Sequence, residues 1–558
     1  MLKRLFILVA LVFISPPLLS DSTPNVPIED PVYREIDKLM AVGLVKEVIL
    51  SQRPWSRSEI ARILARAIEN RKEIPSEEAR QTVWITIDRL LTKLQSRFRQ
   101  ELIDLGTLEG ESPKIIIRPL ETAQFDYTLL DSPSRLVPTS NGLGQIDATI
   151  NPFVENQNGK HFVDGNSLRL ETTHWVKLSK YFSLYAEPQV EALAPNTGSS
   201  DLNLLAQKLY GKVAYKNLEL EVGRDELIWG QSPHGGLILS DNARPLDMLK
   251  AGTISPFYLP GFLKYVGPTT FQLFFADMGP EREFPHAILS GYRVSLLPVT
   301  FFEISLNHVV MMGGNGADDP TPMEAIGEYT GILSTATGNR HQGAFTNRLF
   351  SGEARVVIPP LRNSAFYVEA GFDDTNTEID VLLQDDATYL TGFYIPRLSS
   401  SGSTDLRLEY RHIPALTYRH TQYLSGFTLN QKMLGANTGP DSDSATALLQ
   451  IDLPDYYSYN LSVAYEWRDS DLFTTITEGS SILDILKRQD NPSEQRWRIQ
   501  NNISKEIRNG LEAKIGFGYE RVNDFGFVAG DDRNNLKLSF SLKLFPSLIQ
   551  HSPSGRRR

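Results

Sequence analysis

The spacing of apolar residues divides the chain into a helical part and a much longer strand part. Between Asp30 and Leu105 apolar residues recur at helical intervals, and from Ser112 almost to the end they alternate with polar residues. A period of 3.6 is typical of an amphipathic helix, and a period of two is typical of a strand with one buried face. The sequence therefore predicts a small α-helical bundle followed by a mainly antiparallel β-structure.

Three helices are predicted in the first part. Asp30 and Pro31 mark the start of the first helix, and Ser56 with Glu59 has the spacing of a capping box at the start of the second. The third is predicted as one long helix over 76–105. Its basic residues lie away from the apolar stripe, which is the usual arrangement on the solvated face of a helix.

The alternating part has the features of a transmembrane β-barrel. From Phe182 to Glu191 apolar and polar residues take turns, and the last run, 536–545, is apolar at every second position and ends on an aromatic residue. Short turns such as Ser179-Lys180 and Leu297-Pro298 are predicted at one end, and long polar segments at the other. Strands of about ten residues then give about 18 strands. A soluble β-sandwich or propeller also alternates, but the chain has no propeller-like repeat, and the final run suits a closing strand.

The first twenty residues indicate secretion. Lys3 and Arg4 precede an apolar run from Leu5 to Ile14, which is followed by two prolines and Ser20. That run is half of the roughly 20 residues that a membrane-spanning helix needs, so cleavage after Ser20 is predicted rather than anchoring. The predicted organisation is a signal peptide (1–20), a periplasmic α-helical domain (21–111), an outer-membrane β-barrel (112–546) and a C-terminal tail (547–558).

Composition narrows the function classes. The chain contains no cysteine, which excludes disulfides, thiolate metal sites and a cysteine nucleophile. Its net charge of -11 argues against a nucleic-acid partner, because a phosphate-binding surface needs a basic field. No cofactor, metal ion or catalytic residue is predicted.

One segment, VGRDELIWGQSPHGGLILSDNARPL from Val222 to Leu246, departs from the alternation and is dense in chemical groups. Its glycines let the backbone bend, so it could serve as a catalytic loop, a ligand cradle or a plug inside a barrel. An enzyme is disfavoured because Ser232 and His234 lack the G-x-S-x-G elbow and a fixed base geometry.

The chain contains several compound motifs: Tyr33-x-x-Ile36-x-x-Leu39-x-x-x-Gly43-Leu44, Arg53-Pro54-x-Ser56-Arg57-x-Glu59-Ile60, Gly223-Arg224, Trp229-Gly230 and Leu237-Ile238-Leu239-Ser240-x-Asn242-Ala243-x-Pro245. In their order along the chain they resemble the capsule-assembly Wzi family. The resemblance implies an 18-stranded outer-membrane barrel plugged by periplasmic helices, acting as a lectin that helps to hold or assemble capsular or other surface polysaccharide. The implied partners are that polysaccharide, outer-membrane lipids and polysaccharide export machinery.

The candidate polysaccharide-binding residues lie in the bent segment. Tryptophan stacks on the apolar face of a sugar ring, Asn and Asp bond its hydroxyls, and Arg pairs with acidic sugars. The candidates are Arg224, Asp225, Trp229, His234, Asn242 and Arg244. Each of the charged residues could instead pair with opposite charges on the barrel wall.

A carbohydrate porin is the alternative, because the helical part also resembles cell-wall-binding segments that precede some porin barrels. What separates the two functions is whether the lumen is open. A glycine-bent segment that folds inward and obstructs the lumen favours the lectin.

Overall fold

The computed structural model describes residues 21–75, 82–317, 321–330, 346–373, 387–478, 481–508 and 510–546. The predicted signal peptide and the predicted C-terminal tail both lie outside the described residues. No helix in the described ranges is long and apolar enough to span a membrane.

Four helices form the N-terminal bundle: α2 (Val32–Ala41), α3 (Arg57–Lys72), α4 (Thr82–Arg97) and α5 (Arg99–Asp104). The Ser56 hydroxyl caps α3 by accepting a hydrogen bond from the Glu59 N–H at 3.2 Å. The predicted single helix over 76–105 is wrong. It is interrupted at Phe98, whose backbone leaves the helical region at φ -104° and ψ 24° while its buried ring remains in the core of the bundle.

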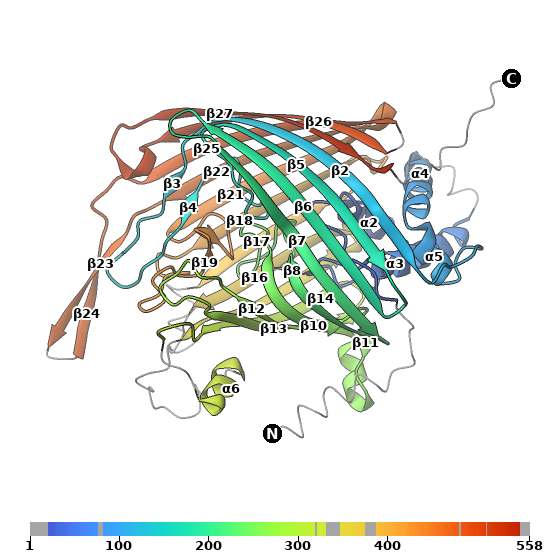
Figure 1. Ribbon diagram of the computed structural model, residues 1–558, viewed down its shortest axis with the longest axis horizontal. Coiled ribbons are helices and arrows are strands. Elements are labelled where there is room, and N and C mark those ends of the chain that lie inside the picture. Colours follow the sequence, from blue (N-terminus) through green and yellow to red (C-terminus); the bar gives the residue numbers. More distant parts are fainter. Residues whose placement is uncertain are drawn as a thin grey trace.

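Eighteen strands of the described chain close into an antiparallel barrel, and β2 pairs with β27 to complete it (Figure 1). The strands are β2 (Ile116–Asp131), β5 (Gly165–Lys177), β6 (Phe182–Pro195), β7 (Asp201–Tyr215), β8 (Leu218–Asp225), β10 (Leu246–Thr253), β12 (Pro268–Asp277), β13 (Ile288–Val299), β14 (Phe302–Met312), β15 (Thr346–Ile358), β16 (Ser364–Asp373), β17 (Thr388–Ile395), β18 (Thr404–Ile413), β21 (Ser442–Leu453), β22 (Tyr457–Arg468), β25 (Glu494–Arg508), β26 (Leu511–Asn523) and β27 (Arg533–Leu544). The two-residue β11 (Phe257–Tyr258) also pairs with β12.

The polarity of the barrel wall is that of a membrane protein. Apolar side chains such as Leu184 and Val190 on β6 are exposed on the outer face, whereas Glu187 and Glu191 on the same strand are buried inside. The interior charges form pairs, for example Lys250 with Glu221 at 2.8 Å. An apolar outer band and a polar interior are the signature of a transmembrane β-barrel, so the strand faces predicted from the alternation are confirmed.

The two ends of the barrel differ in their connections. At one end, which we call the helix end, the strands are joined by short turns, and the helical bundle is attached there (Figure 1). The Asn363 amide, in the turn after β15, donates to the Ala41 carbonyl of α2 at 2.9 Å. At the other end, the loop end, long segments join the strands. One predicted turn is wrong: Leu297 and Pro298 lie within β13, which accommodates them through a register shift between Leu296 and Val299.

Several loop-end connections carry short elements of their own. They are β3 (Arg135–Leu136), β4 (Thr149–Ile150), β9 (Ile228–Trp229), α6 (Pro322–Thr330), β19 (Thr428–Leu429), β20 (Lys432–Met433), β23 (Leu472–Glu478) and β24 (Ser481–Arg488). At the helix end, β1 (Gln52–Arg53) lies between α2 and α3, and a 3-10 helix, η3 (Gly261–Val266), lies between β11 and β12.

Candidate functional site: a closed lumen with a polar pocket at the loop end

The bent segment predicted from the sequence folds into the barrel. We call residues 226–245, which join β8 to β10, the plug segment. Its strand β9 does not pair with the barrel wall but with β1 of the N-terminal region, so that Trp229 lies opposite Gln52 and Ile228 opposite Arg53. Gly230 has a φ of +132°, a conformation that side chains disfavour, and this bend lets the chain fold back on itself.

The plug segment is held from the helix end by polar contacts. The Arg53 guanidinium donates to the Pro233 carbonyl at 3.0 Å and to the Gly230 carbonyl at 3.3 Å. The Ile28 N–H donates to the Glu226 carboxylate at 3.0 Å. Hydrogen bonds to charged partners contribute about 1.5–3 kcal/mol each, so these contacts fix the plug segment on the N-terminal region.

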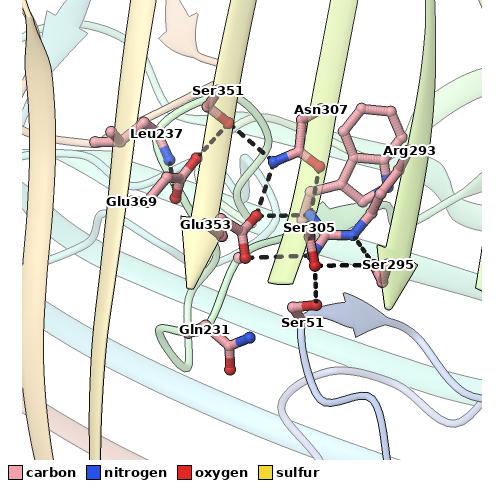
Figure 2. A network of polar contacts seen from close by, with 12 residues as sticks. Ser51, Gln231, Leu237, Arg293, Ser295, Ser305, Asn307, Ser351, Glu353 and Glu369 are labelled. Atoms are coloured by element: carbon pink, nitrogen blue, oxygen red, sulfur yellow. Dashed lines mark hydrogen bonds and ion pairs between the residues drawn. The ribbon is translucent and has the colours of Figure 1, made fainter. Parts of the chain in front are cut away.

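A buried network on the barrel wall holds the same segment from the side (Figure 2). The Leu237 N–H donates to the Glu369 carboxylate at 3.0 Å, and the Ser351 hydroxyl donates to the same carboxylate at 2.8 Å. Ser351 accepts from Asn307, which lies beside the Arg293–Glu353 ion pair of 2.7 Å. The plug segment is thereby tied to the inner faces of β13 to β16.

Two other loop-end connections, 132–164 and 414–441, complete the filling of the lumen. Tyr418, Tyr423 and Phe427 are fully buried, and they belong to one apolar core with Leu237 and Ile146. This core also contains wall residues from many strands of the barrel. The lumen is therefore occupied by a packed protein interior, which is the obstruction that the glycine-bent segment led us to expect.

Three of the six candidate residues are buried and make contacts within the protein. Trp229 is fully buried, donates from Nε1 to the Gln272 side chain at 2.7 Å and packs edge-on against Phe274 at 5.4 Å. The Asp225 carboxylate accepts from the Asn25 amide at 2.6 Å, and the Asn242 amide donates to the Met433 carbonyl at 3.1 Å. The predicted stacking of a sugar on Trp229 needs a free ring face, and packing leaves none in this structure.

The other three candidates keep some exposure. Arg224 and Arg244 both pair with Asp247, at 2.8 and 3.1 Å, near the loop-end termini of β8 and β10. His234 pairs with Asp241 at 3.0 Å and is half-exposed. The Ser232 hydroxyl donates to Glu409 at 3.1 Å, so it does not form a pair with His234. The structure brings Arg224 and Arg244 together and leaves His234 apart from them.

A polar pocket of about 420 Å³ lies at the loop end and was missed by the sequence analysis. Three inward-folding connections build it, and its exposed side chains offer both hydrogen-bond donors and acceptors. Its lining includes Asp147, His161, Glu281, Ser425, Thr428, Asn430 and Gln431. These residues lie in separate long connections without a shared motif, so only the tertiary fold reveals them as neighbours. In the described ranges no group of acidic and histidine side chains could hold a metal ion.

Comparison with known proteins identifies the family. The family model described as "Capsule assembly protein Wzi" matches residues 139–537. The chain belongs to the Wzi family. Family membership and the apolar outer wall place it in the outer membrane.

Two relatives are informative. The solved structure of Wzi from Escherichia coli, described as an outer-membrane protein involved in group 1 capsule assembly and a carbohydrate-binding β-barrel, superposes with a TM-score of 0.62 at 17% identity, covering 94% of this chain and 99% of that one. An uncharacterised 55.8 kDa protein from the cps region of Klebsiella pneumoniae is 26% identical over 294 residues, which is 52% of this chain and 47% of that protein. The chain thus spans about half the length of this curated relative.

A porin likeness is much weaker. OccD3 of Pseudomonas aeruginosa superposes with a TM-score of 0.40 at 10% identity, covering 78% of this chain and 95% of that one. Likeness at that level does not bear on function.

Proposed function

We propose that this chain binds surface polysaccharide at the loop end of a closed outer-membrane barrel and helps the polysaccharide to assemble or attach at the cell surface. The observation that carries the proposal is the combination of a filled lumen with a polar pocket above it. A barrel whose interior is packed cannot pass sugars, but its loop end can hold them.

The chemistry of the pocket suits a glycan. Its volume is within the range of small-ligand sites, about 300–1,000 Å³. The carboxylates of Asp147 and Glu281 accept hydrogen bonds from sugar hydroxyls, and the Asn430 and Gln431 amides both donate and accept. The described activity of Escherichia coli Wzi, a family member, as a carbohydrate-binding barrel supports the same conclusion.

The orientation follows from the connections. Outer-membrane barrels place short turns in the periplasm and long loops outside. In the orientation that we propose on this basis, the helix end faces the periplasm with its helical domain, and the loop-end pocket faces the cell exterior. Polysaccharide export machinery, a partner implied by the family, would approach from the periplasmic side.

The test is equilibrium binding of labelled capsular polysaccharide, isolated from the cells that carry the protein, to the purified full-length barrel in detergent. The double variant His161→Ala, Glu281→Ala removes one donor and one acceptor from the pocket. Two lost hydrogen bonds of about 1 kcal/mol each weaken binding roughly tenfold or more.

The matched control is His286→Ala. His161 pairs with Glu191 at 2.7 Å, and His286 likewise pairs with an acidic residue at the loop end, Asp277 at 2.9 Å, but His286 does not line the pocket. We expect the control to bind like the unmodified protein. Absence of binding by the unmodified protein, or equal binding by the double variant, would rule out this site.

A further inference from the structure

The barrel wall has a notch beside β8. The loop-end part of β7, from Asp201 to Lys208, which we call upper β7, pairs with β6 along one edge. Along its other edge β7 pairs with β8, but only from Leu209 to Tyr215. Among the described residues no strand pairs with the other edge of β7 above that point. The chain leaves the wall at Asp225 to form the plug segment, and it returns at Leu246. Early departure of β8 therefore leaves a step in the loop-end rim of the closed barrel, where one edge of β7 is unpaired, and we call this step the notch.

A pocket of about 220 Å³ lies in this notch. Upper β7 contributes Leu205, Ala206 and Gln207 to its lining, and the ends of β8 and of the plug segment contribute Arg224 and Arg244. Two loops that fold inward contribute Lys160, His161 and Asn430. Every charged side chain of its described lining is basic. Lys160 pairs with Glu171 at 2.8 Å and His161 with Glu191 at 2.7 Å, whereas Arg224 and Arg244 share one carboxylate, that of Asp247, so the positive charge in excess lies at the two arginines.

The surroundings of the notch are apolar and face outward. Below it, Leu220, Val222 and Leu249 are exposed on the outer wall next to Arg224. Beside it, Leu202 and Leu204 of upper β7 are 75% and 78% exposed, among the most exposed apolar residues of the barrel. The two arginines thus lie where the apolar outer wall meets the recess at the loop end of the barrel.

We propose that the notch binds the phosphorylated sugar head of an outer-leaflet glycolipid, with the lipid's acyl chains lying along the leucine-rich outer wall. Guanidinium groups recognise phosphate through paired, charge-assisted hydrogen bonds, and Arg224 and Arg244 offer two such groups side by side. Gln207 and Asn430 supply partners for the sugar hydroxyls. A soluble acidic glycan would pair with the arginines equally well, but it has no acyl chains to pack against the exposed leucines.

The notch lies next to the proposed polysaccharide site, but lipid binding in the notch does not require that the polysaccharide site is correct. His161 and Asn430 line both pockets, so a glycolipid head in the notch lies directly beside the loop-end pocket. A barrel that holds a surface lipid and a polysaccharide as neighbours would keep the polymer close to the membrane. Lipid binding is tested with a lipid that carries no polysaccharide, so the two proposals stand or fall separately.

The experiment measures binding of diphosphorylated lipid A to the detergent-purified, full-length protein by native mass spectrometry, with phosphatidylcholine as the zwitterionic comparison. The unmodified protein should retain lipid A and not phosphatidylcholine. The double variant Arg224→Gln, Arg244→Gln should bind lipid A at least tenfold more weakly. Loss of one charge-assisted hydrogen bond from an arginine raises the dissociation constant about tenfold. Leu220→Gln with Val222→Gln, on the outer wall where the acyl chains would lie, should weaken lipid A binding as well.

Two further variants keep the result interpretable. Arg521→Gln breaks a comparable exposed ion pair, Arg521–Asp532 at 2.7 Å, on β26, which is six strands from β8 around the barrel, and should leave lipid A binding unchanged. Asp247→Asn removes the carboxylate that occupies both arginines and should strengthen lipid A binding. Heat-modifiable gel mobility shows that each variant is folded.

Three results would overturn the proposal. One is equal binding of lipid A by the unmodified protein and the double arginine variant. Another is weaker lipid A binding in Asp247→Asn, which would make the arginines structural. The third is loss of acidic polysaccharide binding alone in the double arginine variant, which would assign the notch to a soluble glycan.

Discussion

Replacement of Trp229 by alanine separates a packing role from a ligand-binding role. The side chain is fully buried at the centre of the plug, donates to Gln272 at 2.7 Å and contacts the Phe274 ring at 5.4 Å. Truncation of a buried tryptophan costs about 3–5 kcal/mol, because the cavity that it leaves cannot fully collapse. Trp229→Phe keeps most of the ring but leaves the buried Gln272 oxygen unpaired, which costs about 1–3 kcal/mol.

The assay is urea unfolding in detergent, followed by the gel mobility of folded and unfolded barrel. Trp497→Ala is the matched control, since Trp497 is 55% exposed on the outer wall and detergent or lipid fills the vacated space. Its loss removes mainly a ring contact with Tyr465, worth about 1 kcal/mol. Unchanged stability of Trp229→Ala together with lost polysaccharide binding would refute the packing role and restore the sugar-stacking prediction.

Two other predictions concern ion pairs. Arg293→Met leaves the buried Glu353 without its partner and should lower the free energy of unfolding by about 3–5 kcal/mol, against less than about 1 kcal/mol for the exposed Arg521→Gln; equal losses in urea unfolding would contradict this. In the helical domain, burial raises the pKa of Asp30, but the Arg97 guanidinium outweighs burial and holds that pKa at about 2, below its ordinary 3.8. A depressed pKa stabilises the fold above about pH 4 by about 2 kcal/mol, and this contribution is lost as pH falls toward 2. Asp30→Asn should therefore destabilise the helical domain at neutral pH and reduce the dependence of its stability on pH in the acid range. Limited proteolysis at a series of pH values measures both effects, and an unchanged pH profile would show that the Asp30–Arg97 pair does not contribute to acid sensitivity.

The barrel could be predicted from the sequence because each strand carries its own signal. Alternation in runs such as 182–191 reports a wall with one apolar and one polar face, whatever the neighbouring strands are. The break at Phe98 could not be predicted, because the apolar spacing continues across it and only packing in the bundle shows the change of direction.

The site was harder to predict because it is assembled from loops. The glycines of 226–245, in a segment that carries Trp229, two arginines and an asparagine, indicated an inward fold, but they did not show that Trp229 would be buried. Tyr418, Tyr423 and Phe427 were a usable signal, since three large rings in a connection of this length point to a buried loop. Arg224 and Arg244 meet at Asp247, close to both in the β8–β10 region, whereas His161 and Asn430 become neighbours in the pockets only through the tertiary fold.

Conductance of the intact protein in a planar lipid bilayer distinguishes a polysaccharide-binding barrel from a porin most directly. The packed lumen, held by the β1–β9 pairing and by the Leu237–Glu369 contact, predicts no stable channels in the nanosiemens range. Stable nanosiemens channels, which sugars block from one side, would contradict the closed barrel and make the protein a carbohydrate porin.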